Sequence, residues 1–412
     1  MEWILTERDR ASIRFAEEER EDDCFMSTHE KNDKNGIFQS NRSDGRFVTI
    51  EGSLHVRLKN LDQKLAFSPE MSAEEHREWR GKVRTTLRGL LCIHEEGKDE
   101  SEEPQMLWSE AREGYELQKW EAYPEPYTVV PFLVLVPDGI DETSPGAAVM
   151  CFPGSSATKE RLAGEPEVVD WPVSTKHPER NKMAWHCAQA GLIAVAMDHP
   201  DRGERTNNMF EDSRYEIGVD ALWLGRSFES ISVAEKLHVY NWLKTRSYVN
   251  AEQIAVSGHS LGAKPALHMG VIQPDIAAVV WNDFCAHWLK RQLSVVSWRP
   301  HLGHYIPGMQ QWFDYTDLMA AVAPRPFLIT EGGRTEDIER ILEAWKCTET
   351  PENFKVTYYP KYGNPEQRPH DDDPLFEGMS MEEYFEYANV DVPHHCFKEN
   401  VVVPWLTNIL SE

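Results

Sequence analysis

Short apolar runs and segments of helical periodicity alternate along the chain from about residue 115 to its end. The apolar runs have the length and the β-branched content of strands, and turn residues bound them. Uninterrupted apolar strands separated by helices are typical of a parallel sheet covered on both faces, so the pattern predicts an α/β fold. Strands are expected at 115–122, 128–136, 146–152, 192–197, 254–257, 276–281, 326–330 and 354–359, and helices at 182–190, 223–246, 261–272, 336–346 and 398–410.

The first 114 residues follow a different pattern, and we expect them to form a partly helical N-terminal extension that packs on a main domain of residues 115–412. Asn, Asp, Glu and Lys crowd residues 18–45, a composition typical of disorder or of a wrapping segment. A helix is predicted from Ser72, because Ser72 and Glu75 form a capping box ahead of apolar residues at helical spacing. The extension is either a packed element, which we favour, or a cover over a functional site.

Residues 284–316 interrupt the alternation of strands and helices and are expected to be an insertion. They are rich in tryptophan and histidine, and they follow a predicted strand, so they should emerge at the carboxyl edge of the sheet, where ligands bind in open α/β folds. Trp288, Trp298 and Trp312 are therefore candidates for the wall of a pocket. A plain structural cover is an equally good interpretation of this segment.

The charge balance excludes some partners. Lys and Arg number 43 against 69 Asp and Glu, which gives a net charge of −26. Nucleic acid and an anionic membrane surface would both repel such a chain, so neither is expected as a partner. The N-terminus lacks a cationic start before an apolar stretch, and no window reaches the roughly 18 apolar residues of a membrane span. We expect a cytoplasmic protein, or a secreted one if a leader has been removed.

Metal binding is not expected. The seven cysteines are scattered and form no CxxC pair, so reduced thiols are a simpler account than a disulfide framework or a zinc site. The segment 198–205 after a predicted strand, with the sequence DHPDRGER, mixes acids with a histidine as a metal site would. One loop rarely supplies convergent ligands, so an ion-pair network is the favoured interpretation. No metal and no organic cofactor is predicted.

The residues Gly258-His259-Ser260-Leu261-Gly262 form the pattern G-x-S-x-G between a predicted strand and a predicted helix. A strand that turns directly into a helix holds its central residue in a strained left-handed conformation, and side chains at the flanking positions would collide. This context is that of the nucleophile elbow, which presents a serine hydroxyl at a helix N-terminus. Ser260 is therefore a candidate nucleophile, and a tight packing turn is the alternative.

A serine nucleophile needs a histidine base and an acid that orients it, and after a nucleophile elbow the chain order is serine, acid, histidine. Glu331 is the candidate acid, because it ends a predicted strand ahead of two glycines; Glu336 and Asp337 compete with it from the first turn of the next predicted helix. His394 and His395 precede the last predicted helix, where the base is expected.

An oxyanion hole would need two backbone N–H groups. One is expected from Leu261, directly after the serine, and the other from Ser155 or Ser156 in the loop after strand 146–152. An ordinary turn is the alternative for that loop. His259 beside the serine should point away from it, and the strand 276–281 should end at the border of the site. The residues expected around the pocket are Gly154, His259, Trp281, Asp283, Trp288, Trp298, Trp312 and His394.

Seven segments carry a resemblance to a known family. PGSSATKERLAGEP, AMDHPDRGE, WLGRS, SGHSLGAKP, WNDF, APRPFLITEGG and YANVDVPHHCFKENVVVPWL resemble the acetyl xylan esterase-like branch of the dienelactone hydrolase-related α/β-hydrolases. The resemblance covers the chain from about residue 115 to its end and implies the α/β-hydrolase fold. It also implies that Ser260 is the nucleophile, that Glu331 is the acid, and that His395, two residues before Phe397, is the base rather than His394.

The resemblance and the motifs together predict a serine carboxylic-ester hydrolase that works through a Ser-His-Glu triad and an acyl-enzyme. The expected substrate is a small-molecule or oligosaccharide ester, above all an acetylated carbohydrate. A peptidase, a thioesterase or a lactone hydrolase would use the same triad, so these activities remain alternatives. A non-catalytic binding protein on the same fold is an alternative of another class.

Overall fold

The computed structural model of the protein describes residues 38–93, 102–168, 177–206 and 213–411. The mutual contacts of the residues divide the chain into two compact units, residues 1–53 and residues 54–412. In the first unit, an exposed ion pair joins Arg42 and Asp44 beside a turn. The second unit contains the sheet and is described below.

The strands of the described residues form one nine-stranded, mostly parallel sheet in the order β1-β2-β3-β5-β4-β6-β7-β8-β9. The first three strands run antiparallel to their neighbours, and the six from β5 to β9 in this order are parallel. The bounds are β1 Glu102–Arg112, β2 Tyr115–Tyr123, β3 Val130–Pro137, β4 Gly146–Phe152, β5 Ile193–Met197, β6 Val249–His259, β7 Ala278–Asn282, β8 Phe327–Ile329 and β9 Phe354–Val356.

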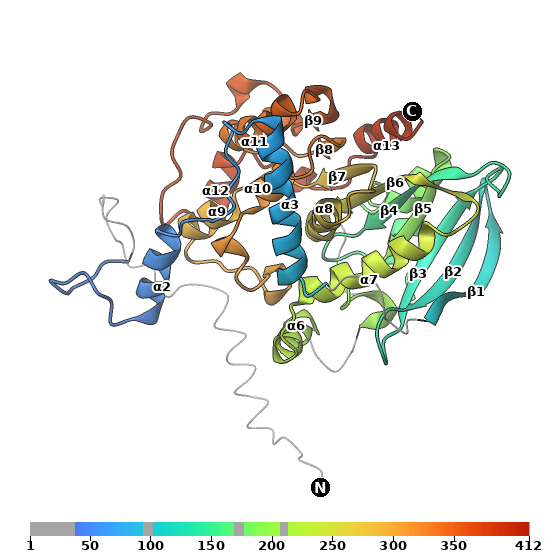
Figure 1. Ribbon diagram of the computed structural model, residues 1–412, viewed down its shortest axis with the longest axis horizontal. Helices are drawn as coiled ribbons and strands as arrows, with labels where there is room; N and C mark the ends of the chain where they lie inside the picture. Colours follow the sequence, from blue (N-terminus) through green and yellow to red (C-terminus); the bar gives the residue numbers. More distant parts are fainter. Residues whose placement is uncertain (1–37, 94–101, 169–176, 207–212, 412) are drawn as a thin grey trace, which may run out of the picture. The chain divides into compact units, whose positions relative to one another are not determined.

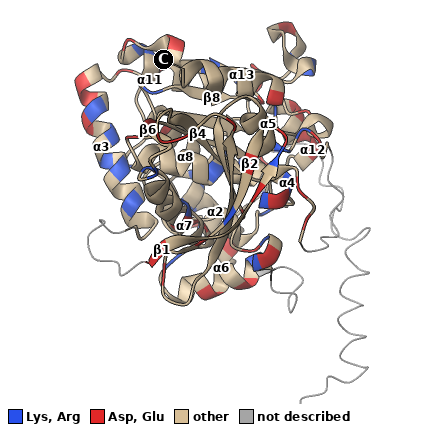
Figure 2. Cartoon of the chain, turned by 90° about the vertical axis from the view of Figure 1, so that its right-hand side faces the viewer, with Lys and Arg blue, Asp and Glu red and all other residues tan. Residues whose placement is uncertain are grey.

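Helices cover both faces of the sheet (Figure 1). The described α-helices are α2 Ile50–Lys59, α3 Ala73–Leu90, α4 Lys159–Ala163, α5 Met183–Gln189, α6 Ser213–Trp223, α7 Phe228–Leu243, α8 Ala263–Ile272, α9 Trp288–Ser294, α10 Tyr315–Ala320, α11 Thr335–Cys347, α12 Met381–Tyr387 and α13 Glu399–Ile409. Strand β4 carries no charged residue, whereas α3 carries many, as Figure 2 shows. None of the described helices combines the length and the apolar character that crossing a bilayer needs.

Alternate side chains of the central strands build two separate cores, because successive residues of a strand point to opposite faces. Met150 and Val256 belong to the core that α3, α7, α8, α10 and α11 cover. Val149 and Ala255, one residue earlier in each strand, belong to the core that α4, α5 and α13 cover. The buried strands are apolar along their whole length because each of their faces packs on helices.

One helix boundary differs from that expected. The helix predicted at 223–246 is α7, which begins only at Phe228, because Gly225 has a φ of +70° and Ser227 caps the N-terminus of α7; Trp223 is the last residue of α6. The unit that contains the sheet begins at Leu54 and includes α3 and β1. The capping box of Ser72 and Glu75 at the start of α3 is present as predicted.

The expected insertion 284–316 consists of α9, two short 3₁₀ turns and the start of α10. It follows the carboxyl end of β7, as expected. Trp298 and Phe284 pack on a third apolar cluster, formed mainly by residues between Tyr359 and Val390. The insertion and this cluster therefore form one layer beside the carboxyl edge of the parallel strands.

Candidate active site

The turn between β6 and α8 has the sharp geometry that the G-x-S-x-G pattern predicts. Ser260 has a φ of +52°, which lies in the left-handed region that residues other than glycine rarely adopt. A Cβ atom on Gly258 would lie 2.0 Å from the carbonyl oxygen of Gly262, and one on Gly262 would lie 2.4 Å from the carbonyl oxygen of Phe152. Only glycine fits at these two positions, so Ser260 is held at the tip of the turn, one 3₁₀ turn ahead of α8.

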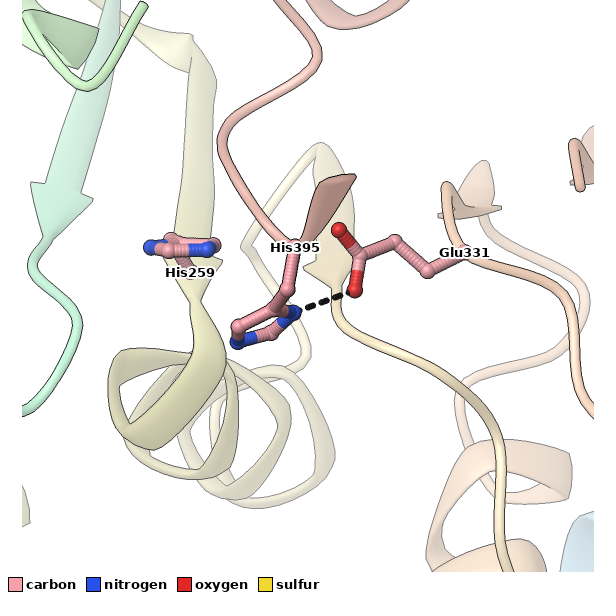
Figure 3. A group of neighbouring side chains, drawn as sticks. All are labelled: His259, Glu331 and His395. Carbon is pink, nitrogen blue, oxygen red and sulfur yellow. Dashed lines mark hydrogen bonds and ion pairs between the residues drawn. The ribbon is translucent and has the colours of Figure 1, made fainter. Parts of the chain in front are cut away.

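His395 and Glu331 form a hydrogen-bonded pair at the same edge of the sheet. The ring Nδ1 of His395 donates to Oε2 of Glu331 at 2.6 Å, and the other ring nitrogen is turned away from the carboxylate (Figure 3). Glu331 follows β8 and is fully buried. His395 lies on the segment that leads into α13, so the two residues come from separate parts of the chain that meet at this edge of the sheet.

Four donors surround the carboxylate of Glu331. Besides His395, the hydroxyl of Tyr359 donates to Oε2 at 2.6 Å. Lys398 Nζ and the backbone N–H of Cys396 donate to Oε1 at 2.5 and 3.3 Å. Every oxygen of the buried acid therefore has at least two hydrogen bonds, and both cationic partners approach it from the last segment of the chain.

The charges of this pair shift both pKa values. Burial alone would raise the pKa of Glu331, but the attraction of His395 and Lys398 outweighs it and lowers the pKa to about 2. Burial would lower the pKa of His395, but the carboxylates of Glu331 and, more weakly, Asp283 outweigh burial and raise it above the ordinary value of 6.5. The carboxylate is therefore ionised and favours the imidazolium form of its partner.

The other acids considered for this role lie elsewhere or farther away. Glu336 and Asp337 are on α11 and face Lys290, at 3.2 and 3.8 Å. Asp283, at the end of β7, approaches His395 Nδ1 only to 4.0 Å. Of these four acids, Glu331 alone is within hydrogen-bonding distance of the imidazole.

The two histidines next to the candidate residues occupy different environments. His394 is exposed over 59% of its side chain, pairs with Asp391 and does not line the pocket at Ser260. The ring of His259 is buried, and its centroid lies 4.7 Å from that of His395. Burial and the neighbouring His395 charge lower the pKa of His259 to about 3, so this ring is neutral.

The loop after β4 lies against the serine, as expected of an oxyanion hole. A Cβ atom on Gly154 would approach Ser260 Cβ to 3.6 Å and His259 Nδ1 to 2.9 Å, so a side chain here would crowd the turn. Ser155 and Leu261 line a pocket with Ser260. Ser156 does not line that pocket, so Ser155 is the better placed of the two serines.

The segment 198–205 fixes this loop. His199 Nε2 donates to the carbonyl of Pro153 at 2.8 Å, and Arg202 Nε donates to the carbonyl of Ser155 at 2.6 Å. Lys159, at the far end of the loop, is fully buried and pairs with Asp198 at 3.0 Å. It also pairs with Glu160 and Glu204 at 2.6 and 2.7 Å. The favoured interpretation of this segment as an ion-pair network is therefore confirmed.

A pocket of about 230 Å³ lies at the serine, and Ser260 and His395 both line it. Three of the residues expected around it, Asp283, Trp288 and Trp298, are in its wall. Gly154, His259, His394, Trp281 and Trp312 do not line it. The indole of Trp281 is buried in the core, and that of Trp312 lies 4.5 Å from the ammonium of Lys64. The insertion thus contributes two of its three predicted tryptophans.

Comparisons with known proteins bear on the family. The model of the Abhydrolase family matches residues 29–408. The chain belongs to this family of α/β-hydrolases. The crystal structure of a provisionally assigned acetyl xylan esterase from Bacteroides fragilis is 34% identical, with a TM-score of 0.82 over 91% of this chain and 98% of that one. The predicted fold and the predicted resemblance are confirmed. Membership of this family also identifies the protein as a hydrolase.

Two of the other solved structures that match are less similar. A glucuronoyl esterase from Solibacter usitatus is 13% identical, with a TM-score of 0.49 over 70% of this chain and 86% of that one. A dienelactone hydrolase candidate from Klebsiella pneumoniae is 14% identical, with a TM-score of 0.37 over 65% of this chain and 93% of that one. The search of curated proteins finds no significant match.

Several residues of this α/β-hydrolase site were not predicted from the sequence. Lys264 and Arg291 are buried and line the pocket, and Tyr359 and Lys398 hold Glu331. Lys264 had a detectable signal, because it follows the serine by one helical turn and so faces the same side. Tyr359 lies far from the other residues in the sequence, and no local pattern marks it.

The ligand atoms of His259, Glu331 and His395 lie within 4.8 Å of one another, a spacing that would also suit metal ligands (Figure 3). The oxygens of Glu331, however, already accept four hydrogen bonds. The ammonium of Lys398 is one of these donors and would repel a cation at the same carboxylate. The arrangement therefore suits an acid–histidine pair better than a metal.

The raised pKa of His395 predicts the pH dependence of the α/β-hydrolase. A histidine base acts only when neutral, so kcat/KM should rise with pH to a plateau, with a midpoint above 6.5. In Glu331→Gln the main charge that favours the imidazolium is lost, so the midpoint should move to lower pH. Asp283, which raises the pKa of His395, and Lys398, which lowers it, are both still present. Initial rates on a neutral ester, measured for both proteins, give the midpoints. A wild-type midpoint at or below 6.5 would contradict the coupling.

Proposed function

We propose that the protein is a serine carboxylic-ester hydrolase that works through an acyl-enzyme, with Ser260, His395 and Glu331 as its triad. The observation that carries the proposal is the hydrogen bond of 2.6 Å from His395 Nδ1 to Glu331, next to a serine held at φ +52° in the same pocket. Acid, base and nucleophile follow each other in the order expected of this fold.

In the first step the hydroxyl of Ser260 attacks the ester carbonyl carbon. Because Nδ1 of His395 carries the proton shared with Glu331, its Nε2 has a free lone pair and takes the proton of the serine hydroxyl. Glu331 stabilises the imidazolium that forms and keeps the ring in this tautomer. Removing such an acid leaves a weaker and less well oriented base.

The negative oxygen of the tetrahedral intermediate would be held by the backbone N–H groups of Leu261 and Ser155. Donors fixed in advance stabilise the transition state more than mobile water does, because they need not reorganise during the reaction. The hydrogen bonds from His199 and Arg202 to the loop carbonyls support this role, since they hold the loop in place before substrate arrives.

The protonated His395 then gives its proton to the leaving alcohol, and the acyl group stays on Ser260. The same imidazole then takes a proton from water, which attacks the acyl carbon. The bond to Ser260 breaks, the carboxylic acid leaves, and His395 returns the proton to the serine oxygen. Both half-reactions use one base, so the pH dependence of the whole cycle depends on His395.

The substrate class that we propose is an acylated, above all acetylated, carbohydrate or related small ester. A pocket of about 230 Å³ is below the roughly 300 Å³ of ordinary small-ligand sites, which favours a small acyl group. The indoles of Trp288 and Trp298 offer apolar surface to a sugar ring. The name of the 34% identical relative supports the same class.

A panel of esters tests the substrate class. We expect kcat/KM to be highest for acetate among 4-nitrophenyl esters of increasing chain length, and acetylated monosaccharides to be hydrolysed as well. Thioesters, lactones and peptides of similar size should react more slowly. A preference for long acyl chains, or for one of these other bonds, would contradict the proposed class without excluding a serine nucleophile.

Ser260→Ala is expected to abolish ester hydrolysis, with a loss of about 10⁴-fold or more in kcat, since the nucleophile is removed with little change in packing. Ser156→Ala is the control, because it keeps the backbone and lies outside the pocket wall. A fluorophosphonate probe should label the wild type and Ser156→Ala but not Ser260→Ala, and circular dichroism checks the fold. Activity of folded Ser260→Ala within about tenfold of the wild type would exclude Ser260.

The two adjacent histidines should differ strongly when each is replaced by alanine. His395→Ala removes the base and should abolish turnover, whereas His394→Ala removes an exposed ring and should only weaken it. Steady-state rates of both variants on 4-nitrophenyl acetate make the comparison. Equal losses, or a larger loss in His394→Ala, would show that the base is assigned to the wrong ring.

A further inference from the structure

Arg291 is a buried cation in the wall of the pocket, and in the described part of the chain no carboxylate lies within 4.0 Å of its nitrogens. It is 7% exposed, its Nε is buried without a hydrogen-bond partner, and its Nη2 contacts the sulfur of Met381 at 3.5 Å. A sulfur is a weak acceptor. Among the described residues, the N–H groups of this guanidinium therefore have no strong hydrogen-bond acceptor.

Three other arginines with little exposure, Arg205, Arg340 and Arg325, have oxygen acceptors for their guanidinium groups. Arg205 pairs with Glu235 at 2.6 Å, and Arg340 pairs with Asp317 at 2.6 Å. Arg325 donates to three backbone carbonyls instead. The fold thus provides acceptors for these cations, and Arg291 differs from them.

Aromatic rings surround Arg291 in place of acids. Its guanidinium carbon lies 4.5 Å from the ring centre of Trp298, 5.1 Å from Trp288, 5.4 Å from Tyr384 and 5.8 Å from Phe385. Ring faces stabilise a cation and fix its orientation, but they accept no strong hydrogen bond. They leave the N–H groups available to a ligand that enters the pocket.

The position of Arg291 indicates which part of an ester it would meet. Phe385, whose ring it approaches, lines the pocket together with Val390, Val392 and His395. Phe385, Val390 and Val392 precede His395 in the chain, and His395 is the residue that would protonate the leaving alcohol. The backbone N–H groups of Ser155 and Leu261, which line the same pocket, would hold the carbonyl oxygen. Arg291 therefore lies toward the alcohol part of a bound ester.

We propose that Arg291 binds a carboxylate on the alcohol part of the substrate, so that the preferred esters are acylated sugar acids or other acylated hydroxy acids. This inference rests on the proposed function and narrows its substrate class. The planar guanidinium can donate two parallel hydrogen bonds to a carboxylate, which gives orientation as well as affinity.

A single negative charge fits the pocket better than a double one. Asp283 lines the same pocket and would repel a dianion such as a phosphate ester. The amine of Lys264, the other buried basic group that lines the pocket with Arg291, contacts Nδ1 of His304, and burial lowers its pKa well below the ordinary value. Arg291 is thus the main permanent positive charge available to a ligand on this side.

The test compares two matched esters, a mono-O-acetyl glucuronate and the corresponding mono-O-acetyl glucose, which differ in one carboxylate. The wild type should prefer the glucuronate ester in kcat/KM. Arg291→Met keeps an apolar side chain among the rings but loses the charge, and should reduce that preference roughly 10- to 100-fold. Arg291→Lys should restore part of it. Lys290→Gln removes an exposed charge from the same helix and should leave the preference unchanged.

A wild type that hydrolyses both esters equally, or an Arg291→Met protein that loses activity on both in the same proportion, would overturn the proposal and make Arg291 a packing residue. If neither ester is hydrolysed and Ser260 does not react with a fluorophosphonate, the proposed function itself fails. Labelled Ser260 with activity only on the neutral ester would overturn the carboxylate proposal alone.

Inhibition of the wild type gives a second test that does not depend on how the variants fold. Glucuronate should inhibit hydrolysis of 4-nitrophenyl acetate competitively, and its neutral amide, glucuronamide, should inhibit at least tenfold more weakly. Equal inhibition by acid and amide would contradict a carboxylate site at Arg291.

Discussion

The buried carboxylate of Glu331 is the constraint on which the arrangement of the site depends. An ionised carboxylate away from water is tolerated only with opposite charge and hydrogen bonds, and leaving a buried charge without its partner costs about 3–5 kcal/mol. Its partners are Tyr359 from the layer after β9 and His395, Cys396 and Lys398 from the segment before α13. Satisfying this one group therefore brings the last part of the chain to the carboxyl edge of the sheet. Orientation of the histidine and stability of the fold are thus coupled, and a change at Glu331 affects both.

A steric constraint on the backbone acts on the other side of the site. Gly258 and Gly262 allow β6, the turn at Ser260 and the end of β4 to pack more closely than residues with side chains would permit. The loop that lies against the turn is fixed by hydrogen bonds to its carbonyls from His199 and Arg202. Strain at Ser260 is tolerated because packed elements on every side determine its conformation. The site therefore combines one electrostatic constraint and one steric constraint, which come from different parts of the sequence.

Local signals predicted most of this arrangement, and the exceptions have physical reasons. The buried strands and the turn at Ser260 follow from apolar runs and from glycine spacing, which depend on short stretches of sequence. Strand β1 was missed because it is an exposed edge strand with mostly polar residues, without the apolar pattern of the interior strands. The tryptophans were equivalent in the sequence, yet Trp298 lines the pocket and Trp281 is buried in the core. Which side chains converge on Glu331 or remain unpaired, as Arg291 does, depends on tertiary packing that no local pattern encodes.

The strongly acidic chain is compatible with an anionic ligand because the two effects act over different distances. At physiological ionic strength exposed charges are screened beyond about 8 Å, so the net charge of −26 opposes the approach of an anion only weakly. Arg291 is removed from water and is screened much less, so its attraction at contact is stronger than that of an exposed cation. The nearby Asp283 then sets an upper limit on the charge of the ligand, because a second negative charge would meet it within the same pocket. An acidic surface with one buried, unpaired guanidinium thus selects anions by close contact rather than by long-range attraction.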